Sequence, residues 1–384
     1  DAGGDAVLPA LVAARQQFAA AAAAEAAEAA LGRRRAWLHT RERPCPALTR
    51  RLRAPAADRV VTALRNANGQ LITHGPTLSQ RVAGFWAGVS AQPATSQAAQ
   101  QEVLQALAGG RNLDAEQAAQ LGQAAVLPAE VLRALRSAPS GKSPGHDGIP
   151  VELYRQFKTA FAPVLCRLFT AIATLDLLPS RFHEGLISII FKAGERSDPA
   201  NYRPITLLCT DYRLYAKVLA QRLNPCLSSI IDPEQTAFVP GRRIGENILT
   251  LQCLSELLRM EGRSAVVVFC DFRKAYDTID RGFLFSAMAA LGGGAGFLAM
   301  VRRLLTATAA RALVNGWTST PAASAAGVRQ GCPLAPLLYL FIAQALLRLL
   351  KTRGLGIDVA GQRLAALQYA DDAHGLQVVS AATA

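Results

Sequence analysis

The sequence lacks the cysteine and histidine spacings that mark structural metal sites and disulfide frameworks. Its seven cysteines occur singly, with no C-x-x-C pair, and its five histidines are scattered along the chain. Neither a zinc site nor a disulfide scaffold is therefore expected. This cysteine usage fits a reducing compartment.

Long hydrophobic runs and a leader sequence are also lacking. The nearest approach to a membrane span, PLLYLFIAQALLRLL, is interrupted by Gln344, so the sequence predicts no membrane-spanning helix. The chain begins at Asp1 without the charged segment that opens a signal peptide. Because an initiator methionine is missing, we expect the chain to be part of a longer open reading frame.

Acidic residues and lysine are both scarce. The 384 residues include 41 Lys and Arg against 28 Asp and Glu, which gives a net charge of +13, and only six of the basic residues are lysine. Such a balance favours a polyanionic partner, with nucleic acid ahead of an acidic membrane surface. The alternative is a soluble protein whose surface is merely basic. The length allows about two or three domains.

The first part of the chain is rich in alanine and then in arginine. Residues 8–32 combine many alanines with scattered glutamates, which predicts a helix of weak amphipathicity. Residues 33–55 are dense in arginine and broken by prolines. This second segment is either a solvated linker or an arm that contacts phosphates.

Turn and capping signals follow. Asn68-Gly69 predicts a hairpin turn, because both positions tolerate positive φ. Thr77, after a Gly-Pro pair, is expected to cap a helix that carries Phe85 and Trp86. Further along, the β-branched segment GLISIIFKAG predicts a strand, and LYAKVLAQRL predicts a helix.

Two apolar stretches are associated with carboxylates that no nearby cation compensates. Residues 265–270 form a short strand-like run that ends on Asp271. Asp371 and Asp372 lie within LQYADDAHGLQVV, which contains no Lys or Arg. Alone, Asp271 is better interpreted as a helix cap. Together, the three carboxylates favour a site for two Mg²⁺ ions, which can activate a hydroxyl and stabilise a leaving pyrophosphate. Their convergence is a prediction that spacing alone does not establish.

Other polar residues near these stretches have simpler interpretations. Asp277 and Asp280 fit surface or helix-capping positions. Residues 329–331, Arg-Gln-Gly, predict a loop, and Pro333 fits the first turn of the helix that follows. The free N–H groups at that helix start favour an anionic or polar ligand, and the alternative is a plain loop before a buried helix.

These segments resemble the reverse transcriptases of non-LTR (LINE-like) retrotransposons. The resemblance runs from about residue 66 to the C-terminus and is strongest over residues 140–379. Six elements occur in the order of that family, and the last three look like polymerase motifs A, B and C. They are SGKSPGHDGIP, ISIIFKAGERSDPANYRPITLL, EQTAFVPGRRIGENIL, DFRKAYD, RQGCPLAP and YADD. A group II intron-type maturase is an alternative, although FVPGRR and RQGCPLAP fit the LINE-like group better.

The resemblance implies an α+β right-hand polymerase with fingers and palm. The palm β-sheet would be backed by helices, the chain would stop before the thumb, and a helical extension would precede the fingers. The expected segments are residues 1–65 as a helical and arginine-rich linker, 66–135 as an N-terminal extension to the fingers, 136–250 as fingers, and 251–384 as an incomplete palm.

The resemblance also implies roles for the residues of motifs A and C. Asp271, Asp371 and Asp372 match the metal-binding aspartates. Phe272 offers a backbone carbonyl beside the metals. Tyr276 matches the aromatic steric gate that excludes a ribose 2′-hydroxyl. The implied metals are two Mg²⁺ ions, with Mn²⁺ as a substitute.

Further residues match the nucleotide site of the family. Gln330 and Gly331 correspond to the pair that shapes the site of the incoming nucleotide. Lys192 and Arg203 correspond to the basic fingers residues that clamp the triphosphate. Contacts to nucleic acid are expected from Lys142, Arg242, Arg243 and Arg329.

The implied function is that of an RNA-directed DNA polymerase, which transfers dNTPs onto a primer 3′-hydroxyl under the direction of an RNA template. The expected partners are an RNA template, a DNA primer, dNTPs, and the thumb and endonuclease of a parent polyprotein, with no membrane. The expected location is the nucleus, with a cytoplasmic ribonucleoprotein as an alternative. A catalytically inactive remnant that only binds nucleic acid is the rival function. The intact aspartates and the Gln330-Gly331 pair argue against it, whereas a missing thumb argues for lost turnover.

Overall fold

The computed structural model describes residues 60–175, 178–359 and 361–378. The described residues belong to one compact unit, in which helices are combined with four β-sheets, in agreement with an α+β fold. The helix expected over residues 8–32 and the arginine-rich segment 33–55 lie outside the described residues.

The described part begins with a hairpin and a helix. β1 (Leu64–Arg65) pairs with β2 (Leu71–Ile72), and Gly69 has φ +78°, which confirms the predicted turn. Helix α3 (Gly75–Val89) starts earlier than expected, because His74 and not Thr77 precedes its first residue. Pro76 is accommodated in the first turn, where a proline costs no hydrogen bond.

The next helices precede and flank the first large sheet. They are α4 (Gln97–Ala108), α5 (Ala115–Leu121), α6 (Pro128–Ser137), α7 (Val151–Gln156), α8 (Lys158–Leu175) and α9 (Ser180–His183). Val131 and Leu135 of α6 lie at helical spacing, and both side chains are buried. The apolar faces of these helices, rich in leucine and alanine, pack into a common core.

The five-stranded sheet has the order β4-β3-β6-β7, with β8 paired to β6. Its strands are β3 (Glu184–Phe191), β4 (Tyr202–Leu207), β6 (Thr308–Val314), β7 (Trp317–Thr318) and β8 (Ala322–Ser324). β3 confirms the strand predicted from its β-branched residues and lies antiparallel to β4 but parallel to β6. A short turn, η2 (Pro199–Asn201), lies in the β3–β4 connection, and α3 packs on this sheet through Trp86.

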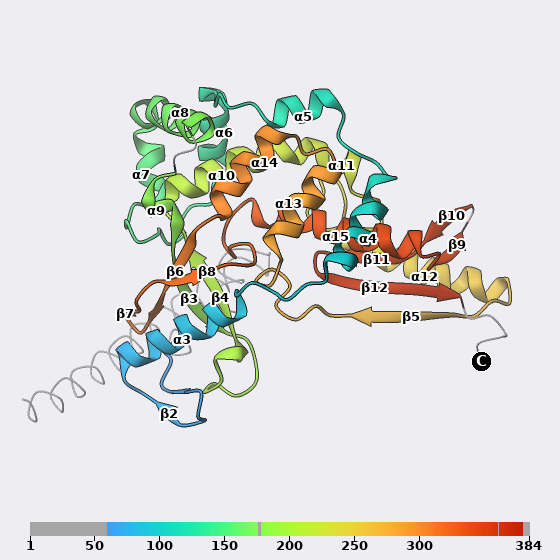
Figure 1. Ribbon diagram of the computed structural model, residues 1–384, viewed down its shortest axis with the longest axis horizontal. Helices are drawn as coiled ribbons and strands as arrows, with labels where there is room; N and C mark the ends of the chain where they lie inside the picture. Colours follow the sequence, from blue (N-terminus) through green and yellow to red (C-terminus); the bar gives the residue numbers. More distant parts are fainter. Residues whose placement is uncertain (1–59, 176–177, 360, 379–384) are drawn as a thin grey trace, which may run out of the picture. The chain divides into compact units, whose positions relative to one another are not determined.

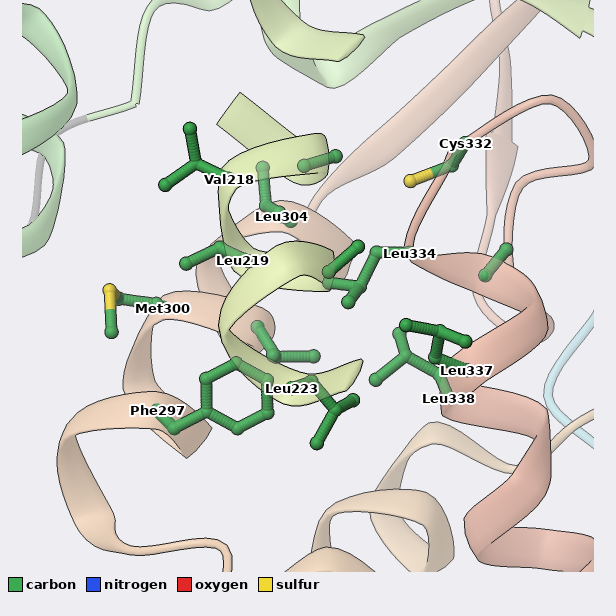
Figure 2. Close-up of a cluster of buried hydrophobic side chains, with 14 of the residues drawn as sticks. Val218, Leu219, Leu223, Phe297, Met300, Leu304, Cys332, Leu334, Leu337 and Leu338 are labelled. Carbon is green, nitrogen blue, oxygen red and sulfur yellow. The ribbon is translucent and has the colours of Figure 1, made fainter. Parts of the chain in front are cut away.

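A helical core lies beside the two larger sheets. Its elements are α10 (Thr210–Leu223), η3 (Asn224–Cys226), α11 (Leu227–Ile230), α13 (Arg281–Ala290), α14 (Ala295–Leu305) and α15 (Ala335–Thr352). Figure 2 shows Leu219 and Leu223 of α10 facing Phe297 and Leu304 of α14, with Leu338 of α15 opposite. All five side chains are buried, so α10 is the central contact between its neighbours.

A three-stranded antiparallel sheet has the order β11-β12-β5. β11 (Ala366–Tyr369) and β12 (Asp372–Val378) form a hairpin, and β12 also pairs with β5 (Ala265–Cys270) (Figure 1). α12 (Ile244–Met260) covers this sheet by packing Leu254 and Leu258 against Val267 and Leu376. Two short strands, β9 (Ile357–Val359) and β10 (Gln362–Leu364), form a separate hairpin before it.

Helix α15 departs from the expectation at its start. The proline in its first turn is Pro336, whereas Pro333 lies in the turn before the helix. By length and composition, α15 and α8 are apolar enough to cross a membrane, although the apolar runs of the sequence predict no such helix. α15 is mostly buried inside the protein, and α8 packs against α6 and α14.

Two of the expected segment borders fall inside helices. The border between residues 135 and 136 lies in α6, and the border between residues 250 and 251 lies in α12. The compact unit begins at Val60, before the expected start of the extension at residue 66. The division into extension, fingers and palm therefore stays a prediction.

Candidate active site

Strand pairing brings the three predicted carboxylates to one end of the three-stranded sheet. Cys270 of β5 lies opposite Ala373 of β12, so Asp271 follows one partner of this pair and Asp372 precedes the other. Asp371 lies in the two-residue turn between β11 and β12. The sheet thus joins segments about 100 residues apart in the sequence.

The charges of these residues act on one another. Burial raises the pKa of the Asp371 carboxyl, and the negative charges of Asp372 and Asp271 raise it further. A backbone N–H and the guanidinium of Arg203 lower the same pKa. Asp271 and Asp372 are exposed, and Asp371 is half-buried. A half-buried carboxylate whose charge is disfavoured by two neighbouring carboxylates has the chemistry of a hard divalent cation site. Asp271, Asp371 and Asp372 would hold such a cation.

Two tyrosines lie beside the carboxylates. Tyr276 stacks on Tyr339 of α15, with ring centroids 4.7 Å apart and an interplanar angle of 29°. Burial raises the pKa of the Tyr276 hydroxyl, as do the charges of Asp371 and Asp372. Tyr276 is therefore held by an aromatic neighbour within electrostatic reach of the aspartates. Sequence reasoning did not single out Tyr339, which no motif marks.

The Gln330-Gly331 loop is fixed against the five-stranded sheet. Thr206 of β4 donates its N–H to the Gln330 carbonyl at 2.8 Å. A Cβ on Gly331 would lie 2.5 Å from the Thr206 carbonyl oxygen, and φ here is +114°, so only glycine fits. The Gln330 side chain donates from Nε2 to Oδ2 of Asp277 at 2.8 Å.

Asp277 corrects one expectation, whereas Asp280 confirms another. Asp277 is neither a cap nor a surface residue, because it is partly buried and binds Gln330. Burial raises the pKa of its carboxyl to about 6, although Lys274 and Gln330 lower it. Asp280 caps α13 by accepting the N–H of Phe283 at 2.9 Å. Burial of Asp277 depends on tertiary packing and has no local sequence signal.

The expected triphosphate residues lie on the β3–β4 hairpin. Both Lys192 and Arg203 are exposed, and the Lys192 N–H donates to the Asn201 carbonyl at 2.9 Å. Arg203 lies close enough to Asp371 to lower its pKa. Lys274, next to the carboxylate segment, donates to the Ala200 carbonyl at 3.0 Å and lies over the Trp86 ring. The segment after β5 is thereby tied to this hairpin and to α3.

The four residues expected to contact nucleic acid divide into two pairs. Lys142 and Arg243 are exposed. Arg329 is only 8% exposed and donates to the Phe182 and His183 carbonyls, so its position is structural and the expected contact is corrected. The Arg242 guanidinium donates hydrogen bonds to three backbone carbonyls, those of residues 231, 232 and 235.

A cavity of about 480 Å³ opens beside Asp371. Its wall is formed by α4, α13, α15 and the segment after β5, and includes Phe272 and Tyr339. Most of the lining is apolar, with side chains such as Val103 and Ile342. The carboxylate end of the sheet therefore borders a cavity with a mostly apolar wall.

A second group with the chemistry of metal ligands lies elsewhere. Ligand atoms of Asp147, Cys209 and Asp211 lie within 4.8 Å of one another, and the three aspartates of the sheet are not drawn together as tightly. Arg181 donates to Asp211 at 2.9 Å, so a cation from the chain already compensates this carboxylate. Burial and the Asp147 charge raise the pKa of the Cys209 thiol to about 11. This group is therefore best interpreted as a buried ion-pair cluster.

Comparisons with known proteins relate this arrangement to one family. Residues 190–375 match the family described as reverse transcriptase (RNA-dependent DNA polymerase). The chain is 33% identical over 245 residues to the "Transposon TX1 uncharacterized 149 kDa protein" of Xenopus laevis. The aligned region covers 63% of this chain and 19% of that protein.

Two Drosophila melanogaster proteins are also similar. The "Retrovirus-related Pol polyprotein from type-2 retrotransposable element R2DM" is 28% identical over 241 residues, with 63% of this chain and 22% of that protein covered. The "Probable RNA-directed DNA polymerase from transposon BS" is 29% identical over 215 residues, with 55% and 23% covered. The chain spans about a fifth of the length of these relatives.

Proposed function

We propose that this chain is the RNA-directed DNA polymerase part of a larger retrotransposon protein of the non-LTR kind, because residues 190–375 match the reverse transcriptase family and the chain is similar to retrotransposon proteins. The reaction is attack of a primer 3′-hydroxyl on the α-phosphate of a dNTP, with release of pyrophosphate. The observation that carries the proposal is the meeting of Asp271 with Asp371 and Asp372 across the β5–β12 pairing.

The three aspartates would hold two Mg²⁺ ions, or Mn²⁺ in their place. Once bound, these ions supply the positive charge that stabilises the attacking oxygen and the leaving pyrophosphate. The raised pKa of Asp371 supports this assignment, since burial raises it, repulsion by Asp372 and Asp271 raises it further, and a bound cation would offset both effects. The backbone carbonyl of Phe272 is proposed as a further oxygen ligand.

The other residues bind and select the nucleotide. Lys192 and Arg203 bind the triphosphate, and Arg203 offers two parallel donors to phosphate oxygens. Tyr276 excludes a ribose 2′-hydroxyl, supported by its place beside Asp371. Gln330 and Gly331 form the wall of the nucleotide site, supported by their attachment to β4.

The proposed organisation assigns fingers and palm to the described residues. α3 belongs to the N-terminal extension, residues 66–135, and β3 and β4 belong to the fingers, residues 136–250. The three-stranded sheet with α13 and α15 belongs to the palm, residues 251–384. The RNA template and DNA primer are bound through exposed cations such as Lys142 and Arg243. The thumb and an endonuclease are supplied by the parent polyprotein, which acts in the nucleus or travels as a cytoplasmic ribonucleoprotein.

A primer-extension assay on an RNA template tests the proposal. With Mg²⁺ and a single dNTP, the chain is expected to add at least one nucleotide to a DNA primer. Asp371→Asn should abolish this addition without unfolding the chain, because it removes a charge and keeps the volume. Binding of the primer-template without any addition by the unaltered chain would favour the inactive remnant instead.

A further inference from the structure

The turn that carries Asp371 has an unfavourable residue at its first position. Tyr369 pairs with Asp372, which leaves Ala370 and Asp371 as the two turn residues of the β11–β12 hairpin. Ala370 has φ +57°, and Asp371 has a negative φ. This combination matches the type II′ turn, whose first position is normally glycine. An alanine in the left-handed region costs about 1–2 kcal/mol.

The side-chain amide of Gln235 forms hydrogen bonds with both the N–H and the carbonyl of Ala370. Its Oε1 accepts the Ala370 N–H at 3.0 Å, and its Nε2 donates to the Ala370 carbonyl at 3.1 Å. The same oxygen accepts the Ala237 N–H at 3.0 Å. Gln235 is fully buried, so these bonds are shielded from competing water.

Backbone pairing fixes Gln235 in front of the turn. Residues 234–236 run parallel to the end of β11, with Gln235 bridged to Gln368. The Thr236 N–H donates to the Gln368 carbonyl at 3.0 Å, and the Gln368 N–H donates to the Glu234 carbonyl at 2.8 Å. The amide of Gln235 is therefore presented to the turn by rigid neighbours.

Few other side chains could replace Gln235. A glutamate would lack the donor for the Ala370 carbonyl, and an asparagine is one methylene too short. A methionine has about the same volume but makes none of these bonds.

We propose that Gln235 is a positioning residue that holds Ala370 in the left-handed conformation and thereby directs the Asp371 carboxylate into the cation site. This inference rests on the proposed function of the three aspartates. The Gln235 side chain bonds to the backbone of Ala370 and Ala237, and it acts on Asp371 through the preceding peptide.

Direct binding of Mn²⁺ to the full chain, followed by electron paramagnetic resonance, tests the proposal. Mn²⁺ bound at the aspartate site is defined as the binding that is lost in Asp371→Asn. Gln235→Met should weaken this Mn²⁺ affinity about five- to thirty-fold, since the two hydrogen bonds that offset the unfavourable φ of Ala370 are lost. Adding Ala370→Gly to Gln235→Met should restore most of the affinity, because glycine adopts positive φ at no cost.

A control and a second variant accompany this experiment. The amide of Asn315 grips the Val61 N–H and carbonyl at 3.0 and 2.7 Å in the same manner, on the five-stranded sheet. Asn315→Gly should leave Mn²⁺ binding unchanged. Ala370→Val leaves every contact of Gln235 in place but strains the turn, and it should weaken Mn²⁺ binding as Gln235→Met does.

Amide hydrogen exchange at Ala370 separates this proposal from the proposed function. Gln235→Met should remove the protection of the Ala370 N–H, and this readout requires no metal. Unchanged protection, unchanged Mn²⁺ affinity, or no rescue by Ala370→Gly would overturn the role of Gln235. If the unaltered chain shows no Mn²⁺ binding that depends on Asp371, the proposed function fails, while exchange still decides whether Gln235 holds the turn.

Discussion

Asp277 makes the folded chain sensitive to pH. Burial raises the pKa of its carboxyl to about 6 from the ordinary value of 3.8. Between these values the folded state binds more protons than the unfolded state, so the free energy of unfolding falls as pH rises. The loss is complete above about pH 6.

Asp277→Asn should therefore stabilise the fold at pH 8 and have a much smaller effect near pH 4. A shift of about two pKa units sets an upper limit of about 3 kcal/mol on the gain at pH 8. Urea unfolding at several pH values measures it. Asp280→Asn is the matched control, because asparagine caps a helix as well as aspartate does. An equal gain at every pH, or none at pH 8, would contradict the account of Asp277.

Tyr276 is expected to set the sugar selectivity. Removing its ring by Tyr276→Ala should admit ribonucleotides, with the preference for dNTPs falling roughly 10- to 200-fold. Tyr276→Phe keeps the ring that stacks on Tyr339 and should keep the preference. Single-nucleotide incorporation of dNTPs and rNTPs measures the ratio. Unchanged discrimination in Tyr276→Ala would remove this residue from the role.

At the residue level, the sequence identifies residues suited to a catalytic role better than it predicts the burial and hydrogen-bond partners of a side chain. Asp271, Asp371 and Asp372 could be singled out because carboxylates at apolar strands are costly without a cation. The partners of Asp277 and Arg329 could not, because the burial of each depends on segments distant in sequence. Gln235 lies in a motif that the resemblance marks, but nothing local predicts its contact with Ala370.

Among secondary-structure elements, β5 is an edge strand of the three-stranded sheet. Within the described residues it pairs only with β12. Val266 and Val268 are 48% and 51% exposed, whereas Val267 packs against the cluster of Leu254 and Leu258. Neighbouring residues of one strand therefore face solvent and core in turn.

An open, apolar edge strand promotes association between copies. Val268→Lys should reduce self-association and keep the fold, as measured by size-exclusion chromatography with light scattering. Val267→Lys is the matched variant on the other face, and it should lower the melting temperature because a charge enters an apolar cluster. If Val268→Lys destabilised the chain as much as Val267→Lys, the assignment of faces would be wrong.

Element types were predictable where the local pattern is strong. β-branched runs predicted β3 and β5, and Asn68-Gly69 predicted the first hairpin. Helix starts were less predictable, because several polar residues and prolines near an end satisfy the same rules. α3 begins at Gly75, after His74, and α15 begins at Ala335, after Leu334, and the sequence predicted neither start.

At the scale of the whole molecule, the net charge of +13 should make binding of a primer-template depend on salt. Each exposed cation that contacts a phosphate adds about 0.7–0.9 to the slope of log affinity against log salt. Arg243→Gln should lower the slope by about this amount. Arg329→Gln should leave the slope unchanged and lower the melting temperature, since Arg329 is buried against backbone carbonyls. Fluorescence anisotropy at several salt concentrations measures the slope for both variants. An unchanged slope in Arg243→Gln would exclude Arg243 from the nucleic-acid interface.

The arrangement of the whole molecule was accessible only through the resemblance. Composition and pattern could not pair β5 with β12, because about 100 residues separate them and register depends on the assembled sheet. The parallel pairing of β3 with β6 is non-local for the same reason.

The central claim is that Asp271, Asp371 and Asp372 form a divalent cation site at the end of the three-stranded sheet. Anomalous X-ray scattering from crystals of the chain grown with Mn²⁺ tests it most directly. The account predicts Mn²⁺ peaks bounded by these three carboxylates, two of them about 4 Å apart when a nucleotide is bound. Peaks at Asp147, Cys209 and Asp211 alone, with none beside Asp371, would contradict it.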